Sequence, residues 1–253
     1  MSGNTIPGTA GLLAALYGLQ EKPLYGREGA SAYDAIARHD PSEIRDVLRL
    51  ARGPVLELAC GSGRLTLPLA ARGHDVVALD NSPALLDLLA DRLPADHAVT
   101  LVEGDMTAFD LGRSFEVVLL GTSSVCLLDE DRRTELFACV RRHLAPGGHF
   151  YLSVLDFAGT LLARTAERST VVVHEQSVIT LLQHFDPRRG VRTTALLRDS
   201  VDGRALYTSE VRLVSSGRLT DELAAAGFAV VEQRRGQDGE QVQVQLVCRS
   251  SDD

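Results

Sequence analysis

The 253-residue sequence predicts an α/β fold. We expect a doubly wound sheet of seven strands, the last of them antiparallel, with a small antiparallel β insertion after the fifth strand. Short apolar runs alternate with helical patterns between residues 41 and 155, as in sheets built from parallel strands and crossover helices. Segments rich in Val, Leu and Thr break this alternation at 169–215. A helix and two more apolar runs then close the chain.

The five expected parallel strands are short apolar runs, each followed by a turn. They are Val55–Leu58, His74–Leu79, Val99–Glu103, Phe115–Leu120 and His149–Leu155. The run at 115–120 is almost wholly apolar, which is typical of a central strand buried on both faces. The helices expected with these strands are 41–54, Arg64–Arg72, Ser82–Leu93 and Glu130–Leu144. Right-handed crossovers place the carboxyl ends of the five strands along one edge of the sheet, where ligands bind.

The segment 169–215 has the pattern of a three-stranded antiparallel insertion. The expected strands are Thr170–Phe185, Val191–Val201 and Leu206–Ser215. Asp202-Gly203 separates the last two, and Asp-Gly between apolar runs is a strong hairpin signal. The main sheet then resumes with a helix at Leu219–Ala226 and strands at Phe228–Arg234 and Val242–Arg249.

Two regions are expected along the chain. Residues 1–40 form an N-terminal helical cap over the site, and residues 41–253 form the main domain, with 169–215 as a lid, acceptor region or dimer contact. The apolar segment Gly8–Leu19 is too short to span a bilayer and lacks the basic start of a signal peptide. We therefore expect no membrane partner.

The net charge and the cysteine spacing argue against a nucleic-acid partner and against a metal site. The chain has 34 acidic and 26 basic residues, a net charge of −8, which argues against a nucleic-acid partner. The four cysteines have neither metal-binding spacing nor a zinc-type pairing with histidine. They are Cys60, Cys126, Cys139 and Cys248. We expect a cytoplasmic protein that uses no metal.

The strongest motif is the turn after the first strand. Gly61 and Gly63 allow a sharp turn and close approach to a ligand, and the following helix directs free N–H groups toward it. A dinucleotide-binding loop usually has a third glycine where this chain has Thr66, and Glu57 would repel a pyrophosphate. The loop therefore favours a zwitterionic ligand without phosphate.

Two more elements follow the next strands. Asp80 ends the second strand, where an acid accepts hydrogen bonds from both hydroxyls of a ribose. The alternative is a helix-capping role, for which Asn81 and Ser82 compete. After the third strand, Asp105 is placed to accept from the exocyclic amine of an adenine, and the N–H of Met106 to donate to its ring.

Together these residues resemble the class I S-adenosylmethionine-dependent methyltransferases, from about residue 55 to 155. The resemblance implies a Rossmann-like sheet, S-adenosylmethionine as cofactor and S-adenosylhomocysteine as product, and because the sequence shows no metal-binding constellation of acids we expect transfer without a metal. It also implies that the segment after the fourth strand faces the transferred methyl group. The residues expected to bind the cofactor are Tyr25, Tyr33, Glu57, Ala59, Gly61, Gly63, Arg64, Asp80, Asn81, Gly104, Asp105, Met106, Gly121 and Thr122.

Three segments, 24–34, 63–69 and 104–110, are similar to the methyltransferases of daptide-type ribosomal peptide pathways. This similarity implies N-methylation of a primary amine, by N-terminal dimethylation of a modified peptide. The chain is also similar to amino-sugar and glycine N-methyltransferases, so N-methylation of an amino sugar, or O-methylation of another small molecule, stays open. We expect the partner to be a small-molecule or peptide acceptor. A homodimer is an open alternative to a monomer.

Few side chains are candidates for contact with the acceptor. Tyr33 and His184 are the expected catalytic residues, each against a purely structural alternative. Asp156 follows the fifth strand and could attract a cationic amine. A dedicated base is optional because an amine can lose its proton to water before it binds. Two other functions are weighed: a non-catalytic cofactor-binding module and a nicotinamide-dependent oxidoreductase.

Overall fold

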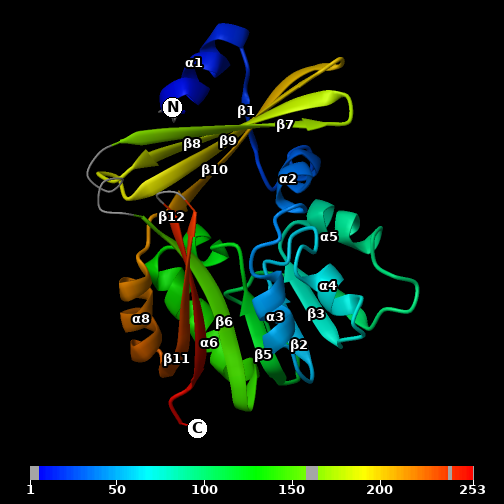
Figure 1. The fold of residues 1–253 in the computed structure, drawn as a ribbon, viewed down its shortest axis with the longest axis vertical. Helices are drawn as coiled ribbons and strands as arrows, with labels where there is room; N and C mark the ends of the chain where they lie inside the picture. Colours follow the sequence, from blue (N-terminus) through cyan, green and yellow to red (C-terminus); the bar gives the residue numbers. More distant parts are fainter. Residues whose placement is uncertain (1–5, 158–164, 239–240, 253) are drawn as a thin grey trace. The chain divides into compact units, whose positions relative to one another are not determined.

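The computed structural model describes residues 6–157, 165–238 and 241–252 (Figure 1). The chain divides into two compact units. One comprises Met1–His39 and Gly159–Leu213, and the other comprises Asp40–Ala158 and Val214–Asp253. Residues 1–39 thus belong to the same unit as the insertion. Their expected role as a cap over the site stays a prediction.

The second unit contains the seven-stranded sheet, in the order β11-β12-β6-β5-β2-β3-β4. The strands are β2 (Val55–Leu58), β3 (Val76–Asp80), β4 (Val99–Glu103), β5 (Phe115–Leu120), β6 (Leu144–Phe157), β11 (Phe228–Asp238) and β12 (Gln241–Ser250). β12 pairs antiparallel with both β6 and β11, whereas the other pairs are parallel. The predicted seven-stranded sheet with an antiparallel last strand is confirmed.

Three of the helices of this unit begin at a residue whose side chain caps the helix. The helices are α3 (Ile44–Leu50), α4 (Thr66–Ala70), α5 (Pro83–Ala90), α6 (Glu130–His143), α8 (Ser216–Ala225) and the 3₁₀ helix η1 (Ser124–Leu127). Ser82, Asp129 and Ser215 each accept a hydrogen bond from a backbone N–H in the first turn of α5, α6 and α8. The N-cap of α5 is thus Ser82, one of the residues expected to compete with Asp80 for that role.

Several boundaries differ from the prediction, and the helix expected at 41–54 covers only Ile44–Leu50. The helix expected from Arg64 begins only at Thr66, because the preceding residues continue the turn of the glycine loop. The strand expected from His149 begins at Leu144, which pairs with β5 before a break in register. Gly147, with φ of 69°, lies in this irregular stretch, so the Pro-Gly-Gly turn falls within β6 instead of before it.

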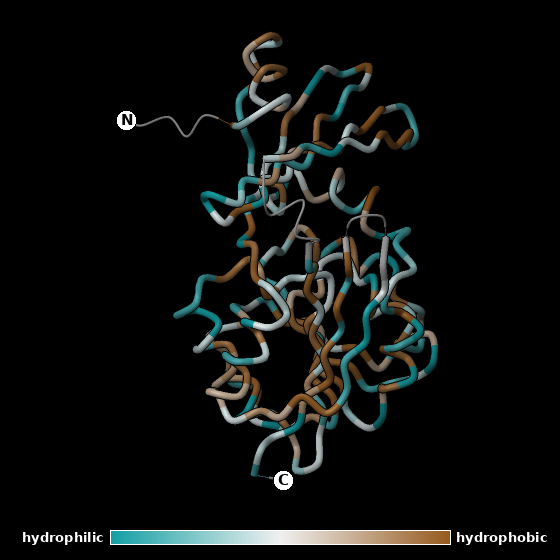
Figure 2. Tube along the Cα trace, turned by 60° about the vertical axis from the view of Figure 1, so that its left-hand side comes forward, coloured by the Kyte–Doolittle hydropathy of each residue, from teal (hydrophilic) through white to brown (hydrophobic). Residues whose placement is uncertain are grey.

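The core of the second unit lies along its central strands, where hydrophobic residues gather (Figure 2). Every residue of β2 and β3 is buried, as are all but one of β5. Burial on both faces explains why these strands read as continuous apolar runs. Among the described residues, no helix is long and apolar enough to cross a bilayer.

The other unit is built on a five-stranded sheet, in the order β1-β10-β9-β8-β7. The strands are β1 (Glu21–Pro23), β7 (Ala166–His174), β8 (Ser177–Asp186), β9 (Val191–Ser200) and β10 (Gly203–Arg212). The predicted antiparallel insertion is present, but it has four strands, β7 to β10, and the predicted number of three is wrong. The run 170–185 is a hairpin that turns at Glu175, whose φ is 52°. No Gly, Pro or Asn marks that turn.

Two helices cover opposite faces of the five-stranded sheet. α1 (Gly8–Tyr17) packs on the face that presents Leu182, and α2 (Ala30–Ala37) packs on the face that presents Leu181. Because successive residues of a strand point to opposite faces, this register assigns each strand side chain to one of the helices.

Candidate functional site

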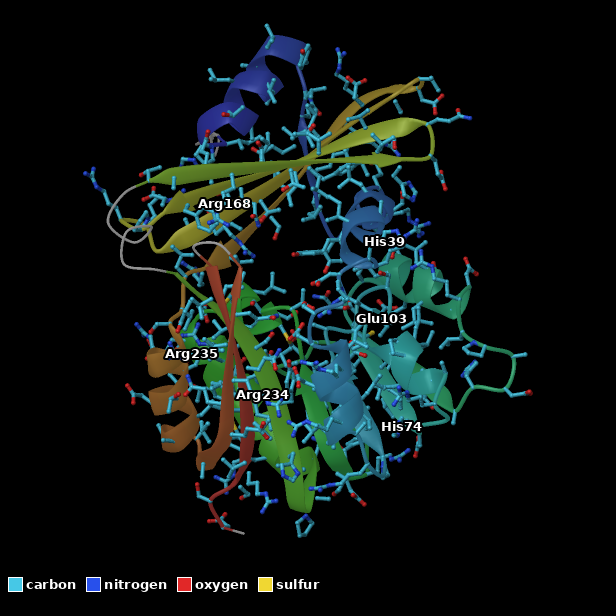
Figure 3. The ribbon with its side chains drawn as sticks, in the orientation of Figure 1. His39, His74, Glu103, Arg168, Arg234 and Arg235 are labelled. Atoms are coloured by element: carbon cyan, nitrogen blue, oxygen red, sulfur yellow. The ribbon has the colours of Figure 1, made fainter. Side chains whose placement is uncertain are left out.

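The carboxyl ends of β2, β3 and β4 bring three of the predicted motifs together. Figure 3 labels His74, which precedes β3, and Glu103, the last residue of β4, toward opposite ends of the sheet. At the carboxyl ends, the N–H of Gly61 donates to Oδ2 of Asp80 at 2.7 Å. The N–H of Gly104 donates to the carbonyl of Asp80 at 3.0 Å. Asp80 thus joins the loops after all three strands.

The glycine loop has the shape that its sequence predicts. Ala59, Gly61 and Gly63 all have positive φ, at 50°, 55° and 90°. A Cβ added to Gly63 would lie 2.2 Å from Cδ1 of Leu89, and φ of 90° favours glycine, so an alanine would be strained and would have to displace the Leu89 side chain. This backbone cradle fits the adenosyl amino acid that the resemblance implies.

Asp80 is almost fully buried at the end of β3. Its two oxygens accept from the N–H groups of Gly61 and Ser82, at 2.7 and 2.8 Å. Burial raises the pKa of Asp80, although these backbone hydrogen bonds oppose the shift. Each carboxylate oxygen can accept a second hydrogen bond, so the group can still hold two ribose hydroxyls. Asn81, the next residue, is exposed.

Glu57 lies beneath the loop and is also buried. The hydroxyl of Thr66 donates a hydrogen bond to its carboxylate. Burial raises the pKa of Glu57 to about 8, because the charged form is poorly solvated there. Thr66, predicted only as a departure from a dinucleotide loop, therefore holds the acid of this motif. Contact between Glu57 and a cofactor ammonium stays a prediction.

Asp105 already has protein partners. Its Oδ1 accepts from the N–H and the hydroxyl of Thr107, both at 2.9 Å, and its Oδ2 pairs with Arg132. Partial burial would raise the pKa of Asp105, but these hydrogen bonds outweigh it and lower the pKa. A bond to an adenine amine would have to use its remaining lone pairs. The predicted roles of Asp105 and Met106 stay predictions.

A buried cluster at the same edge joins Arg64 and Thr122, both predicted to bind the cofactor, to Glu43 and Tyr151, which were not predicted. Glu43 precedes α3, and its fully buried carboxylate pairs with Arg64. It also accepts from the N–H of Thr122 at 3.1 Å and from the hydroxyl of Tyr151 at 3.0 Å. Arg64 also donates to the hydroxyl of Thr122 at 2.7 Å and to the carbonyl of Ser42. We call Glu43, Arg64, Thr122 and Tyr151 the Glu43 cluster.

The turn after β5 is shaped by this cluster. Thr122 and Ser123 have φ of 56° and 58°, in the left-handed region. A Cβ on Gly121 would lie 2.7 Å from a side-chain carbon of Leu65 and 3.5 Å from the Glu43 carboxylate. Glycine at 121 therefore lets the turn approach the cluster. The prediction that Gly121 and Thr122 contact the cofactor stays open.

The two expected catalytic residues lie in the other unit. Tyr33 stacks edge-on against Tyr25, with ring centroids 5.1 Å apart, in the apolar cluster under α2. His184 shares its sheet face with Leu182, on the α1 side, and its Nδ1 lies 3.1 Å from Glu167. Tyr33 and His184 are thus on opposite faces of one sheet.

Asp156, considered above for attracting an amine, has a structural role. Its carboxylate accepts from the N–H and the hydroxyl of Ser216, at 2.7 and 2.6 Å, at the start of α8. A carboxylate at this end of a helix is favoured by the helix dipole. Where the structure describes the chain, no group of three potential ligand side chains could hold a metal ion.

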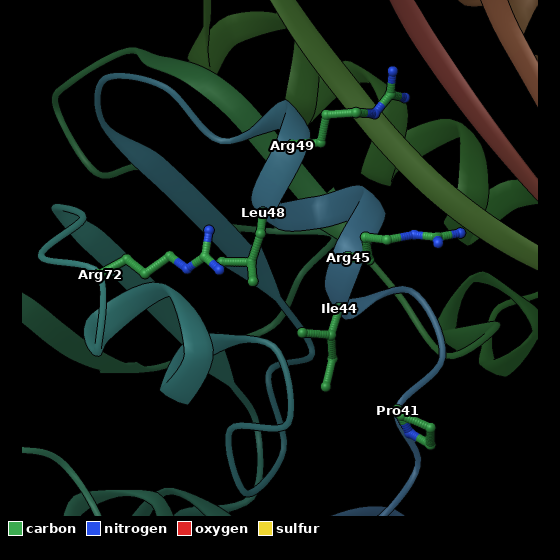
Figure 4. Close-up of a pocket in the computed structure, with 6 residues that line it drawn as sticks. All are labelled: Pro41, Ile44, Arg45, Leu48, Arg49 and Arg72. Carbon is green, nitrogen blue, oxygen red and sulfur yellow. The ribbon is translucent and has the colours of Figure 1, made fainter.

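A surface hollow of about 420 Å³ lies beside α3 (Figure 4). Its lining consists of Pro41, Ile44, Arg45, Leu48, Arg49 and Arg72. None of these residues belongs to the predicted cofactor site.

Comparisons with known proteins agree with this geometry. Residues 55–148 match the model of a family described as a methyltransferase domain. Over 160 residues the chain is 31% identical to the cypemycin N-terminal methyltransferase of a Streptomyces species, covering 62% of each protein. The chain thus spans less than two thirds of that relative.

Two solved structures are similar over most of their length. The CcbJ methyltransferase from Streptomyces caelestis is 26% identical, with a TM-score of 0.75, and the match covers 92% of this chain and 100% of that one. The glycopeptide N-methyltransferase MtfA, complexed with S-adenosylmethionine, is 30% identical with a TM-score of 0.56. That match covers 88% of this chain and 95% of MtfA.

Proposed function

Because the chain belongs to the class I S-adenosylmethionine-dependent methyltransferases, we propose that it methylates a primary amine of a modified ribosomal peptide, by N-terminal dimethylation of the daptide type. The cofactor is S-adenosylmethionine and the product is S-adenosylhomocysteine. Support for an amine acceptor comes from two similar proteins, which are an N-terminal methyltransferase and a glycopeptide N-methyltransferase. We place the reaction in the cytoplasm, consistent with four free and buried cysteines.

One observation carries the choice of an amine over an alcohol. The acids described at this edge already accept hydrogen bonds from protein donors: Glu43 from Tyr151, Glu57 from Thr66 and Asp80 from Gly61. None of them is placed as a dedicated base. An amine needs no strong base, because it can lose its proton to water before it binds, whereas an alcohol needs a base or a metal.

The chemistry then depends mainly on position. When bound, the cofactor supplies a methyl group on a positively charged sulfur. The neutral amine nitrogen forms a bond to that carbon while the carbon–sulfur bond breaks and its electrons stay on sulfur. The new ammonium releases a proton to water, which permits a second transfer. The glycine loop and Asp80 would hold the adenosyl end so that nitrogen, carbon and sulfur lie in line.

A panel of acceptors tests the proposal. The chain is incubated with S-adenosylmethionine and a short peptide with a free terminal amine, beside the same peptide acetylated at that amine. Mass spectrometry should show one and then two added methyl groups on the free peptide and none on the acetylated control. Methylation of an amino sugar or an alcohol, but not of the peptide, would contradict the peptide acceptor. Cofactor binding without methylation of any acceptor would favour a non-catalytic module.

A further inference from the structure

We propose that Glu43 is a positioning residue for methyl transfer: its buried carboxylate holds the turn after β5 against the bound reactants. The inference rests on the proposed function and deepens it by naming a residue outside the glycine loop, the ribose acid and the segment after β4. The order of the strands fixes where a ligand can lie.

The Glu43 cluster lies at the switch point of the sheet. β3 and β4 follow one another on one side of β2, whereas β5 lies on the other side of β2. The loops after β2 and β5 therefore leave the sheet in opposite directions. Ligands of doubly wound sheets bind in the crevice that this divergence opens.

Glu43 spans that switch point. It pairs with Arg64, which follows the loop after β2, and accepts from the N–H of Thr122, which follows β5. Tyr151, on the neighbouring strand β6, donates to the same carboxylate. Glu43 precedes α3, and its side chain thus connects three other segments: the loop after β2, the turn after β5 and the strand β6.

The backbone at this edge is strained in a way that the cluster maintains. In the part of the chain that the structure describes, five residues other than glycine have positive φ. Four of them are at this edge: Glu43, Ala59, Thr122 and Ser123. Such conformations cost on the order of 1–3 kcal/mol each and persist only where surrounding contacts enforce them. Glu43 enforces the conformation of Thr122 by accepting from its N–H.

Tyr151 and Arg64 keep their protons within the cluster. Burial raises the pKa of Tyr151, and the Glu43 carboxylate raises it further, so the phenol stays protonated. Burial disfavours the charged form of Arg64, but the carboxylates of Glu43 and Asp40 outweigh this effect and raise its pKa. Glu43 has a fully buried side chain and three protein donors. It therefore acts through the turn and does not touch the acceptor.

Glu43→Gln tests this role with three readouts. The amide keeps the size of the side chain but cannot accept from all three donors. Loss of alignment should lower kcat for the peptide amine by about 10- to 100-fold, since small displacements of reacting atoms have large effects. The Kd for S-adenosylmethionine should rise by a smaller factor than kcat falls, because the alignment matters mainly during transfer. The amide hydrogen of Thr122 should exchange faster in the cofactor complex. Glu43→Asp should recover part of kcat.

The matched control is Asp46→Asn. Asp46 lies in the first turn of α3 and pairs with Arg234. Its loss should lower stability while kcat stays at the wild-type value. The proposal is overturned if Glu43→Gln behaves like Asp46→Asn, or if it leaves amide exchange at Thr122 unchanged. If wild-type protein methylates no amine, the proposed function fails, and amide exchange at Thr122 alone decides the role of Glu43.

Discussion

The backbone N–H of Gly61 lies 2.7 Å from Oδ2 of Asp80, so the glycine loop and the acid at the end of β3 are held together by a hydrogen bond. The other oxygen of Asp80 accepts from the N–H of Ser82. The acid thus fixes the loop on one side and the start of α5 on the other. A ligand that lies over the loop meets a carboxylate whose position is already set. This preorganisation is the physical basis of the predictions that follow.

Gly63→Ala should weaken both folding and cofactor binding. At φ of 90° an alanine is strained, and its Cβ would lie 2.2 Å from Leu89. Gly73→Ala is the control, because Gly73 also has positive φ, at 76°, but nothing lies within 4 Å of its added Cβ. We expect both variants to lose on the order of 1 kcal/mol through backbone strain. Only Gly63→Ala should also lose affinity for S-adenosylmethionine, and equal affinities in the two variants would contradict the cradle.

Glu57 should make the stability of the ligand-free chain depend on pH. Its pKa is about 8 in the folded chain against 4.5 for an ordinary glutamate. Because the folded pKa is raised, the protonated form is favoured on folding. The stability that Glu57 contributes is fully present below its pKa in the unfolded chain. This stability is lost as the pH rises toward its pKa in the folded chain. Between the two values, unfolding free energy should fall by up to about 1.4 kcal/mol per pH unit.

Glu57→Gln removes this titration, so the variant can be compared directly with wild-type protein. Denaturant unfolding from about pH 5 to about pH 9 should show a flatter dependence for the variant than for wild-type protein. Parallel curves for the two proteins would show that Glu57 does not titrate in this range.

The ion pair between Arg133 and Glu222 should be important for stability. Arg133, on α6, is buried and makes two hydrogen bonds with Glu222, on α8, at 2.6 and 2.7 Å. Glu222→Gln leaves a buried guanidinium without a counter-charge, which should cost about 3–5 kcal/mol. Asp252→Asn breaks the exposed pair with Arg141 and should cost less than about 1 kcal/mol. Urea unfolding of both variants checks this contrast, and similar losses would refute it.

Tyr33 and His184 should not both affect turnover, because they lie on opposite faces of the five-stranded sheet. Nδ1 of His184 faces Glu167, which also accepts from the backbone N–H of Thr9 at 2.9 Å. We expect Tyr33→Phe to lower kcat or cofactor affinity and His184→Gln to leave both near wild type. Steady-state kinetics of the two variants test this expectation. A loss of kcat in His184→Gln but not in Tyr33→Phe would place the acceptor on the face covered by α1.

Patterns that are local in sequence were enough to predict most of the main sheet. β2, β4 and β5 have the predicted bounds, because each is an apolar run that ends at a turn. The β7–β8 hairpin was missed because its turn at Glu175 adopts positive φ without a residue that signals it. β1 was missed because it has only three residues and exists by pairing with β10.

The candidate site also divides into features that a local sequence pattern predicts and features that it does not. The glycine loop and Asp80 carry local signals, since each residue type suits its place at a strand end. The contact between Glu43 and Tyr151 joins residues 108 positions apart, and neither has a sequence context that indicates a partner. Glu43 was predicted only to lie in the helix expected at 41–54, yet it precedes α3 at φ of 68° with its carboxylate buried. Such a contact depends on how the strands are ordered, which no local pattern contains.

Calorimetric titration with S-adenosylmethionine tests the central claim, which is that the cofactor lies over the glycine loop with its ribose on Asp80. Asp80→Ala should weaken binding by about 1–3 kcal/mol, because buried donors lose a charged acceptor. Asp75→Asn, which breaks an exposed pair with Arg113, should bind as tightly as wild-type protein. Unchanged affinity in Asp80→Ala, or binding of a nicotinamide dinucleotide in place of S-adenosylmethionine, would contradict the account.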